Sequence, residues 1–247
     1  MRKQKRTRES LPSVHSADRT RRILVQVAVA AVLIGLIAAS GIDVASKKAE
    51  RDDPGPIPVI AADAGSNPAG IATSLTEGGA IRIGKPSAPR TIRVVADLQC
   101  PACQRFDATY GQLLTDAVNA GTVAVEYDII AFLDHASSTE YSSRAANASW
   151  CAAESDPAAY RNWLETMFEQ QPAEGGDGLP DTAIVDIAAG AGYTDPDFTR
   201  CVTERTYSTF VRARTLEILD SGIQSTPSIF LDGNPIDPAR LASAIGS

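Results

Sequence analysis

The sequence predicts an α/β domain in which strand-forming segments surround a helical insertion. Two β-branched runs, at 91–98 and 123–130, flank a segment whose apolar residues recur at helical spacing. The pattern is then helical over about 138–222, and strand character returns at 228–232. Ahead of this domain, residues 23–42 form an apolar segment long enough to cross a membrane. The expected fold class is therefore a mixed α/β domain preceded by a single N-terminal transmembrane helix.

Composition and charge exclude two broad classes of protein. The chain has 247 residues, of which 44% are apolar and 21% charged, and this ordinary globular composition rules out wholesale disorder. The net charge of −7 conceals a division, because residues 1–22 carry eight Lys or Arg against two acidic residues while the remainder carries 15 against 28. Nucleic-acid binding needs clustered Lys and Arg, so we expect no nucleic-acid partner for so acidic a domain.

The apolar segment 23–42 contains no charged side chain. A helix of this length spans roughly 30 Å, the thickness of the hydrocarbon core of a bilayer. The positive-inside bias predicts that the basic tail 1–22 is cytoplasmic and that the folded domain is extracytoplasmic, as in a single-pass protein of the cell membrane. A signal peptide cleaved near Ala38-Ala39-Ser40 and a twin-arginine signal at Arg21-Arg22 are the alternatives, and each would also export the domain.

Residues 43–70 read as an extracytoplasmic linker. They contain Pro54, Pro56 and Pro58 and show no sustained period of 2 or 3.6. We therefore expect the folded domain to occupy residues 71–247, a length sufficient for one domain with a substantial core.

The first half of that domain has the order strand, helix, strand. Residues 71–76 and 80–84 flank a Gly-containing turn and predict a hairpin. The β-branched runs 91–98 and 123–130 follow, and the helix between them should stop at Gly121. A unit of this length normally forms a right-handed crossover between two parallel strands.

The second half is the helical insertion, expected at about 138–222. Residues 171–180 (QPAEGGDGLP) interrupt it. After it, Ser228–Asp232 predicts a strand, and Asp237-Pro238 predicts the start of a short helix that ends at Ile245. The apolar positions at helical spacing are Tyr160, Trp163, Leu164, Met167 and Phe168 on one segment, and Phe198, Val202, Phe210, Leu216 and Leu219 further on.

The CPAC motif, Cys100-Pro101-Ala102-Cys103, lies where the first β-branched run gives way to the helix. Unpaired backbone N–H groups and the macrodipole at a helix N-terminus stabilise a thiolate, so we expect the Cys100 sulfur to be exposed and acidic. Cys103 lies one turn further in, and Pro101 suits the first turn because it has no N–H to lose. The pattern predicts thiol–disulfide exchange, with Cys100 as the attacking sulfur and Cys103 as the resolving one.

Two other uses of these cysteines are disfavoured. A zinc site needs a second close pair of Cys or His, whereas the remaining cysteines are isolated and the histidines are His15 and His135 alone. A Cys–His nucleophile would need His135, and nothing in the sequence ties that residue to the motif. We therefore predict no metal site, and without a flavin or nucleotide motif we expect no cofactor.

The segments GKPSAPRTIRVVADLQCPACQRF and GIQSTPSIFLDG together resemble the DsbA-like branch of the thioredoxin superfamily. The resemblance runs from about Gly79 to the C-terminus and implies a thioredoxin fold with an inserted helical subdomain. It further implies that Thr226-Pro227 contains a cis-proline opposite the active-site disulfide and that the backbone there pairs with the substrate chain. Without the CPAC motif, Thr226-Pro227 would read as an ordinary turn.

The sequence departs from this family at two positions around the motif. Family members commonly have an aromatic residue in place of Leu98, and His or Tyr in place of Ala102. A histidine between the cysteines adds partial positive charge, so Ala102 should leave Cys100 less acidic and the disulfide less oxidising than in the relatives that have it. We expect substrate binding and redox tuning to involve Pro101, Ala102, Thr226 and Pro227.

Asp97 stands three residues before Cys100 and is a candidate for proton transfer to or from Cys103. The alternative is a carboxylate that faces water and only aids solubility. Strand alternation places Asp97 and Gln99 on one face and Leu98 on the other, but it does not identify the buried face.

The other two cysteines, Cys151 and Cys201, fall fifty residues apart within the helical insertion. Outside the cytoplasm two such cysteines tend to pair, and we predict a structural disulfide between them. A second redox couple that relays electrons is the alternative, although neither cysteine has a CxxC partner.

These features predict an extracytoplasmic thiol:disulfide oxidoreductase that donates the Cys100–Cys103 disulfide to secreted or cell-envelope proteins. The resemblance implies that a membrane quinone reductase, of the DsbB or vitamin K epoxide reductase kind, reoxidises the pair. A disulfide reductase or isomerase of the same fold, and a non-catalytic tethered module that binds peptides, are the competing hypotheses.

Overall fold

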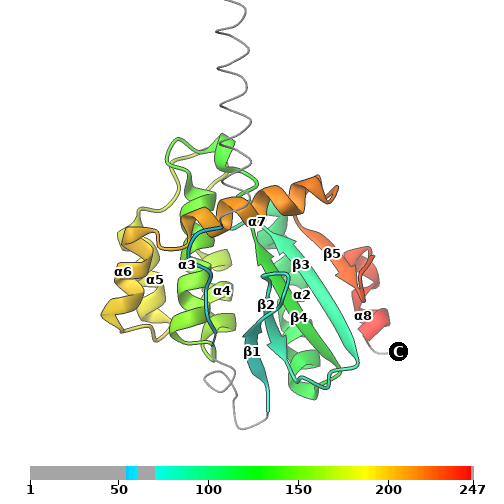
Figure 1. Ribbon diagram of the computed structural model, residues 1–247. Helices are drawn as coiled ribbons and strands as arrows, with labels where there is room; N and C mark the ends of the chain where they lie inside the picture. The colour runs from blue at the N-terminus through cyan, green and yellow to red at the C-terminus, as the bar shows by residue number, and fades with distance from the viewer. Residues whose placement is uncertain (1–53, 61–69, 246–247) are drawn as a thin grey trace, which may run out of the picture. The chain divides into compact units, whose positions relative to one another are not determined.

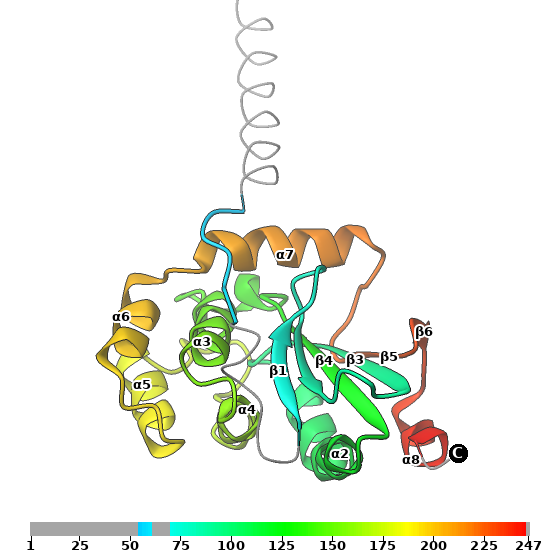
Figure 2. The same cartoon turned by 60° about the horizontal axis from the view of Figure 1, so that its bottom comes forward.

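The computed structural model describes residues 54–60 and 70–245. In that part of the chain a six-stranded sheet runs in the order β1-β2-β4-β3-β5-β6, with β1 to β5 labelled in Figure 1 and β6 in Figure 2. The pair β3 and β4 is parallel and every other neighbouring pair is antiparallel. The strands are β1 (Ala72–Leu75), β2 (Ile81–Gly84), β3 (Arg90–Ala96), β4 (Val123–Ile129), β5 (Ser228–Leu231) and β6 (Asn234–Pro235).

The membrane helix expected at 23–42 and the basic tail 1–22 lie outside the described residues. Within the residues that are described, no helix is both long enough and apolar enough to span a bilayer.

Helix α2 (Pro101–Ala120) makes the crossover from β3 to β4. Its first turn contains Pro101, and Cys100 before it has an extended backbone, as an N-cap residue should. The helix ends at Gly121, whose φ of 75° is left-handed and whose N–H bonds to the carbonyls of Ala117 and Val118. The predicted hairpin of β1 with β2 and the predicted parallel crossover are both present.

Helices cover both faces of the sheet, as Figure 2 shows with α7 (Ser208–Asp220) on one side and α2 on the other. Helix α2 packs on β4 and β2 and also contacts α4 (Tyr160–Glu169). On the opposite face, Val95 of β3 and Ile130 after β4 pack against Ile218 of α7. Strand β3 is thus buried on both faces, which fixes the position of the turn that follows it.

The helical insertion is built around one central helix, α3, which contacts each of the other four helices of the insertion. Its sequence is rich in Ala and Ser, so neighbouring backbones can approach it closely. Trp150 of α3 and Trp163 of α4 are fully buried in the core. The five helices are α3 (Tyr141–Ser155), α4 (Tyr160–Glu169), α5 (Asp181–Gly190), α6 (Pro196–Glu204) and α7 (Ser208–Asp220).

The buried face of α7 differs from the one that its apolar spacing indicated. Leu216 and Leu219 are only half-buried, whereas Arg214 and Thr215 are buried together with Ile218. The reason lies in the sheet, because the Arg214 guanidinium pairs with the fully buried carboxylate of Asp128 on β4.

Three short segments complete the described structure. The 3-10 helix η1 (Asp134–Ala136) lies between β4 and α3, and η2 (Pro238–Arg240) and α8 (Leu241–Ile245) are the last elements of the described part.

Residues 54–60, which the sequence places in the linker, lie along the helical insertion, where the Val59 N–H donates to Glu154 Oε1 at 3.3 Å. The packed part of the chain therefore includes a piece of the expected linker.

Candidate active site

Cys100 occupies the junction between the turn after β3 and the first residue of α2. Its N–H donates to the Asp97 carbonyl at 3.1 Å, which closes the turn, and its own carbonyl accepts from the N–H groups of Cys103 and Gln104. The side chain therefore projects at the N-terminus of a 20-residue helix, where backbone N–H groups lack intrahelical partners.

Thr226 and Pro227 lie against this sulfur. Cys100 Sγ is 3.3 Å from the Thr226 carbonyl oxygen, and the Thr226–Pro227 peptide bond is cis. Both cysteines of the motif are free thiols. The expectation of an exposed Cys100 sulfur was wrong, because Cys100 is only 7% exposed with the Thr226 backbone against it.

The two cysteines differ sharply in acidity. Hydrogen bonds to the Cys100 sulfur from Cys103, from Thr226 and from the backbone N–H groups of Cys103 and Ala102 outweigh its burial and lower the pKa of Cys100 to about 5. Burial, followed by the neighbouring Cys100 sulfur, raises the pKa of Cys103 far above its usual value. The pair thus presents one thiolate and one protonated thiol over the physiological range.

Asp97 lies behind the motif and is fully buried. Its Oδ1 accepts from the Gln99 N–H and the Ser142 hydroxyl, each at 2.7 Å, and its Oδ2 accepts from the Leu133 N–H at 2.8 Å. Burial nevertheless dominates these hydrogen bonds and raises the pKa of Asp97 to about 6. The solvent-facing alternative for this carboxylate is excluded.

Strand alternation does not hold around Asp97. Asp97, Leu98 and Gln99 are all fully buried, because β3 ends at Ala96 and these residues form a turn beneath the helical insertion. The Asp97 N–H also hydrogen-bonds to the Cys103 sulfur. Asp97 therefore connects the resolving cysteine to Leu133, just before η1, and to Ser142 of α3.

The structure joins Cys151 of α3 to Cys201 of α6 in a disulfide, with the two Cα atoms 5.9 Å apart. Asn147 of α3 supports the same contact, since its Nδ2 donates to the Cys201 carbonyl and its Oδ1 accepts from the Tyr207 N–H. The disulfide therefore fastens two helices of the insertion to each other.

Sequence reasoning missed Ser142 and Leu133 as partners of Asp97. They lie 45 and 36 residues away along the chain, and a serine near the start of a helix is unremarkable by itself. No sequence pattern links Asp97 to Ser142, because the fold alone brings the two side chains together.

Metal-ligating side chains do not gather at any one place in the described part of the chain. Its His, Cys, Asp and Glu side chains form no group of three or more that could hold a metal ion. His135 is exposed on η1.

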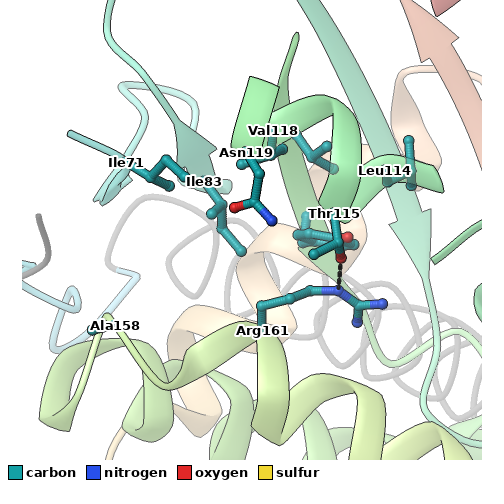
Figure 3. A pocket seen from close by; sticks show the side chains of 10 residues that line it. Ile71, Ile83, Leu114, Thr115, Val118, Asn119, Ala158 and Arg161 are labelled. Atoms are coloured by element: carbon teal, nitrogen blue, oxygen red, sulfur yellow. Dashed lines mark hydrogen bonds between the residues drawn. The ribbon is translucent and has the colours of Figure 1, made fainter. Parts of the chain in front are cut away.

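A cavity of about 140 Å³ lies between α2, α4 and the edge of the sheet, with Ile83, Leu114 and Arg161 in its walls (Figure 3). None of the predicted site residues lines it.

Comparison with known proteins places this architecture in a family. A family model described as Thioredoxin matches residues 76–246. The chain belongs to the thioredoxin family. This membership, together with the mixed sheet and its covering helices, confirms the predicted thioredoxin fold.

Solved structures of DsbA-type proteins are similar to this thioredoxin-family chain. The reduced form of DsbA from Mycobacterium tuberculosis is 29% identical with a TM-score of 0.58, over 67% of this chain and 90% of that one. Reduced DsbG from the same organism is 26% identical with a TM-score of 0.59, over 73% and 88% of the two chains. MdbA from Corynebacterium diphtheriae has a TM-score of 0.61 over 74% and 98%, but at 22% identity it supports the fold alone. The DsbA-like resemblance is thereby confirmed.

Among curated proteins, the serine/threonine-protein kinase PknE of Mycobacterium tuberculosis is 31% identical over 180 residues. The match covers 66% of this chain and 31% of PknE, so the chain spans about a third of the length of this relative.

Proposed function

We propose that this protein, a disulfide oxidoreductase of the DsbA type, donates its Cys100–Cys103 disulfide to thiols of secreted or cell-envelope proteins. The observation that carries the proposal is the Cys100 sulfur at the start of α2, whose hydrogen bonds lower the pKa of Cys100 to about 5. A stable Cys100 thiolate is a good leaving group, and it favours the reduced form of the pair after the disulfide has been given away.

The donor reaction has two exchange steps. A substrate thiolate attacks Cys100 Sγ, the Cys100–Cys103 bond breaks, and the bonding electrons go to Cys103 Sγ, which takes up a proton. A second substrate thiolate then attacks the substrate sulfur of the mixed disulfide and releases Cys100 as a thiolate. The substrate gains a disulfide, and the protein is left as the dithiol.

The proton for Cys103 comes, in our proposal, from Asp97. Cys103 is 1% exposed, so a bare thiolate there is disfavoured and needs a nearby acid. Asp97 is buried, is adjacent to the Cys103 sulfur through its own N–H, and has a pKa raised to about 6, which suits an acid that exchanges its proton near neutral pH.

Substrate chains would lie along Thr226-Pro227, with Pro101 and Ala102 on the other side of the reacting sulfur. Support comes from the 3.3 Å approach of Thr226 to Cys100 Sγ and from the family resemblance. The Cys151–Cys201 disulfide has a structural role in this proposal, because it lies within the insertion and joins α3 to α6.

The cellular setting belongs to the proposal as well. The apolar segment 23–42 would anchor the protein in the cell membrane with its N-terminus in the cytoplasm, and the basic residues of 1–22 support that orientation. A membrane quinone reductase of the DsbB or vitamin K epoxide reductase kind would reoxidise the dithiol. Recovery of the full-length protein in the membrane fraction would support the anchor, whereas a mature N-terminus near Gly41 would contradict it.

Oxidation of a reduced dithiol peptide tests the activity. The oxidised protein should form the peptide disulfide stoichiometrically, and Cys100→Ser and Cys103→Ser should each abolish the reaction, because neither variant can form the Cys100–Cys103 disulfide that is donated. The matched control is the variant with both Cys151→Ala and Cys201→Ala, which should retain activity. Unchanged peptide oxidation by a folded Cys100→Ser variant would contradict the proposal and support a binding module instead.

One observation favours a second candidate, a disulfide reductase or isomerase. Ala102 between the cysteines lacks the positive charge that histidine gives strongly oxidising relatives, so the disulfide is a weaker oxidant than theirs. The reduction potential of the pair distinguishes the two directions.

A further inference from the structure

We propose that Ser142, from the helical insertion, is a positioning residue that holds the Asp97 carboxylate behind the CPAC motif and favours its charged form. The inference rests on the proposed function, because Asp97 is assigned there as the group that exchanges a proton with Cys103. Through Ser142, the second residue of α3, the helical insertion would influence proton exchange at the active site.

The hydrogen bonds of Asp97 single out Ser142. Two of the three donors to the carboxylate are the backbone N–H groups of Gln99 and Leu133, which every sequence with this backbone would supply. The third is the Ser142 hydroxyl, 2.7 Å from Oδ1, and both side chains are fully buried. Ser142 is therefore the side-chain donor through which the sequence can adjust this carboxylate.

The Ser142 hydroxyl stabilises the charged and the neutral forms of Asp97 to different extents. A hydrogen bond to a buried carboxylate stabilises the charged form more than the neutral acid, because the charge has lost its hydration. The Ser142 bond therefore opposes the effect of burial and lowers the pKa of Asp97. Without this bond, Asp97 would remain protonated to higher pH and would accept a proton from Cys103 less readily when the pair closes to a disulfide.

The other titratable groups around Asp97 are few in the described structure. Cys100 at the start of α2 raises the pKa of Asp97 through its charge, and Tyr141 of α3 interacts with the carboxylate in turn. On η1, Asp134 hydrogen-bonds to α3 and His135 is exposed. Oxidation of the cysteine pair removes Cys100 as a titrating group, so the oxidised protein isolates the titration of Asp97.

A purely structural role for Ser142 is the competing explanation, and α3 contains a matched control. Ser149 is also fully buried on α3, and its hydroxyl lies 2.8 Å from the Tyr160 hydroxyl rather than near Asp97. Ser142→Ala and Ser149→Ala each remove one buried hydroxyl from the same helix. Only the first removes a hydrogen bond from Asp97.

The direct test is an NMR titration of the Asp97 side-chain carboxyl carbon in the oxidised full chain. We expect Ser142→Ala to move the titration midpoint up by about one pH unit, because a hydrogen bond to a charged group is worth on the order of one tenfold step in an equilibrium. Ser149→Ala should leave the midpoint in place, and Ser142→Thr, which keeps a hydroxyl, should restore most of the shift.

A kinetic measurement supplies a second readout. In the pH profile of dithiol-peptide oxidation, the limb that depends on Asp97 should move in the same direction and by the same amount in Ser142→Ala alone. An unchanged midpoint in folded Ser142→Ala, or an equal shift in Ser149→Ala, overturns the role of Ser142. Absence of peptide oxidation by the wild-type protein would instead overturn the proposed function, and the NMR midpoints would still decide the role of Ser142.

Discussion

At the residue scale, the difference between Cys100 and Cys103 arises from their positions three residues apart on one helix. Cys100 precedes the first turn and receives backbone N–H groups, whereas Cys103 lies within it and is cut off from water. The sequence predicted this division from the CPAC spacing and the strand-to-helix boundary. It could not predict the burial of Cys100, because the covering residue, Thr226, is 126 positions further along the chain.

Alkylation of the reduced protein tests this division. Iodoacetamide should modify Cys100 with a rate that is half-maximal near pH 5, because the pKa of Cys100 is lowered to about 5. Cys103 should stay unmodified throughout, since burial raises its pKa. The site of modification is read by peptide mass mapping, and Cys100→Ala is the control. A half-maximal rate near pH 9 would contradict the assignment of Cys100 as the stabilised thiolate.

At the element scale, one link joins two helices of the insertion to each other and a second joins the insertion to the sheet. One is the Cys151–Cys201 disulfide between α3 and α6, and the other is the ion pairing of Asp128 on β4 with Arg93 and Arg214. The sequence predicted the first from the number of cysteines. The ion pairing of Asp128 could not be predicted from the sequence, because Arg214 lies 86 residues from Asp128 and occupies a helix face that apolar spacing did not identify.

Removal of the insertion disulfide should lower stability without ending catalysis. In the chain-entropy model a closed loop of fifty residues contributes roughly 4 kcal/mol to the free energy of unfolding. The variant with Cys151→Ala and Cys201→Ala should therefore unfold at a markedly lower urea concentration, measured by circular dichroism, and still oxidise the peptide. Complete loss of turnover in the folded double variant would favour a second redox couple over a structural bridge.

The Asp128 cluster should contribute strongly to stability. Asp128→Ala leaves the buried Arg214 guanidinium without its main partner, a change that typically costs about 3–5 kcal/mol. Glu217→Ala is the matched control, because Glu217 pairs with the same arginine but its side chain is 69% exposed, and such pairs contribute at most about 1 kcal/mol. Urea unfolding of both variants gives the comparison. Equal losses would contradict the assignment of the stability to the buried pair.

At the scale of the whole molecule, local periodicity was enough to predict the hairpin, the crossover and the return of the strand after the insertion. Local periodicity could not predict how the insertion packs around the active site. The Asp97 carboxylate accepts hydrogen bonds from the N–H of Leu133, just before η1, and from the hydroxyl of Ser142 on α3, and both contacts depend on the complete fold.

Burial of Asp97 predicts how the stability of the molecule depends on pH. The folded-state pKa of Asp97, about 6, exceeds the unfolded value of 3.8, so this residue stabilises the fold fully below pH 3.8 and loses that contribution as the pH rises through 6. The loss amounts to about 3 kcal/mol at one pKa unit per 1.36 kcal/mol. Urea unfolding of the oxidised protein at pH 4 and pH 7 should show this fall, and Asp97→Asn should remove it. A fall of the same size in Asp97→Asn would assign it to other groups.

The reduction potential of the Cys100–Cys103 pair, measured by equilibration with glutathione, tests the donor function most directly. A donor must be more oxidising than thioredoxin, whose potential is about −270 mV, and each 30 mV corresponds to about 1.4 kcal/mol. We predict a value well above that of thioredoxin, because the Cys100 thiolate stabilises the reduced pair. A potential at or below that of thioredoxin would contradict disulfide donation and assign the protein to the reductases.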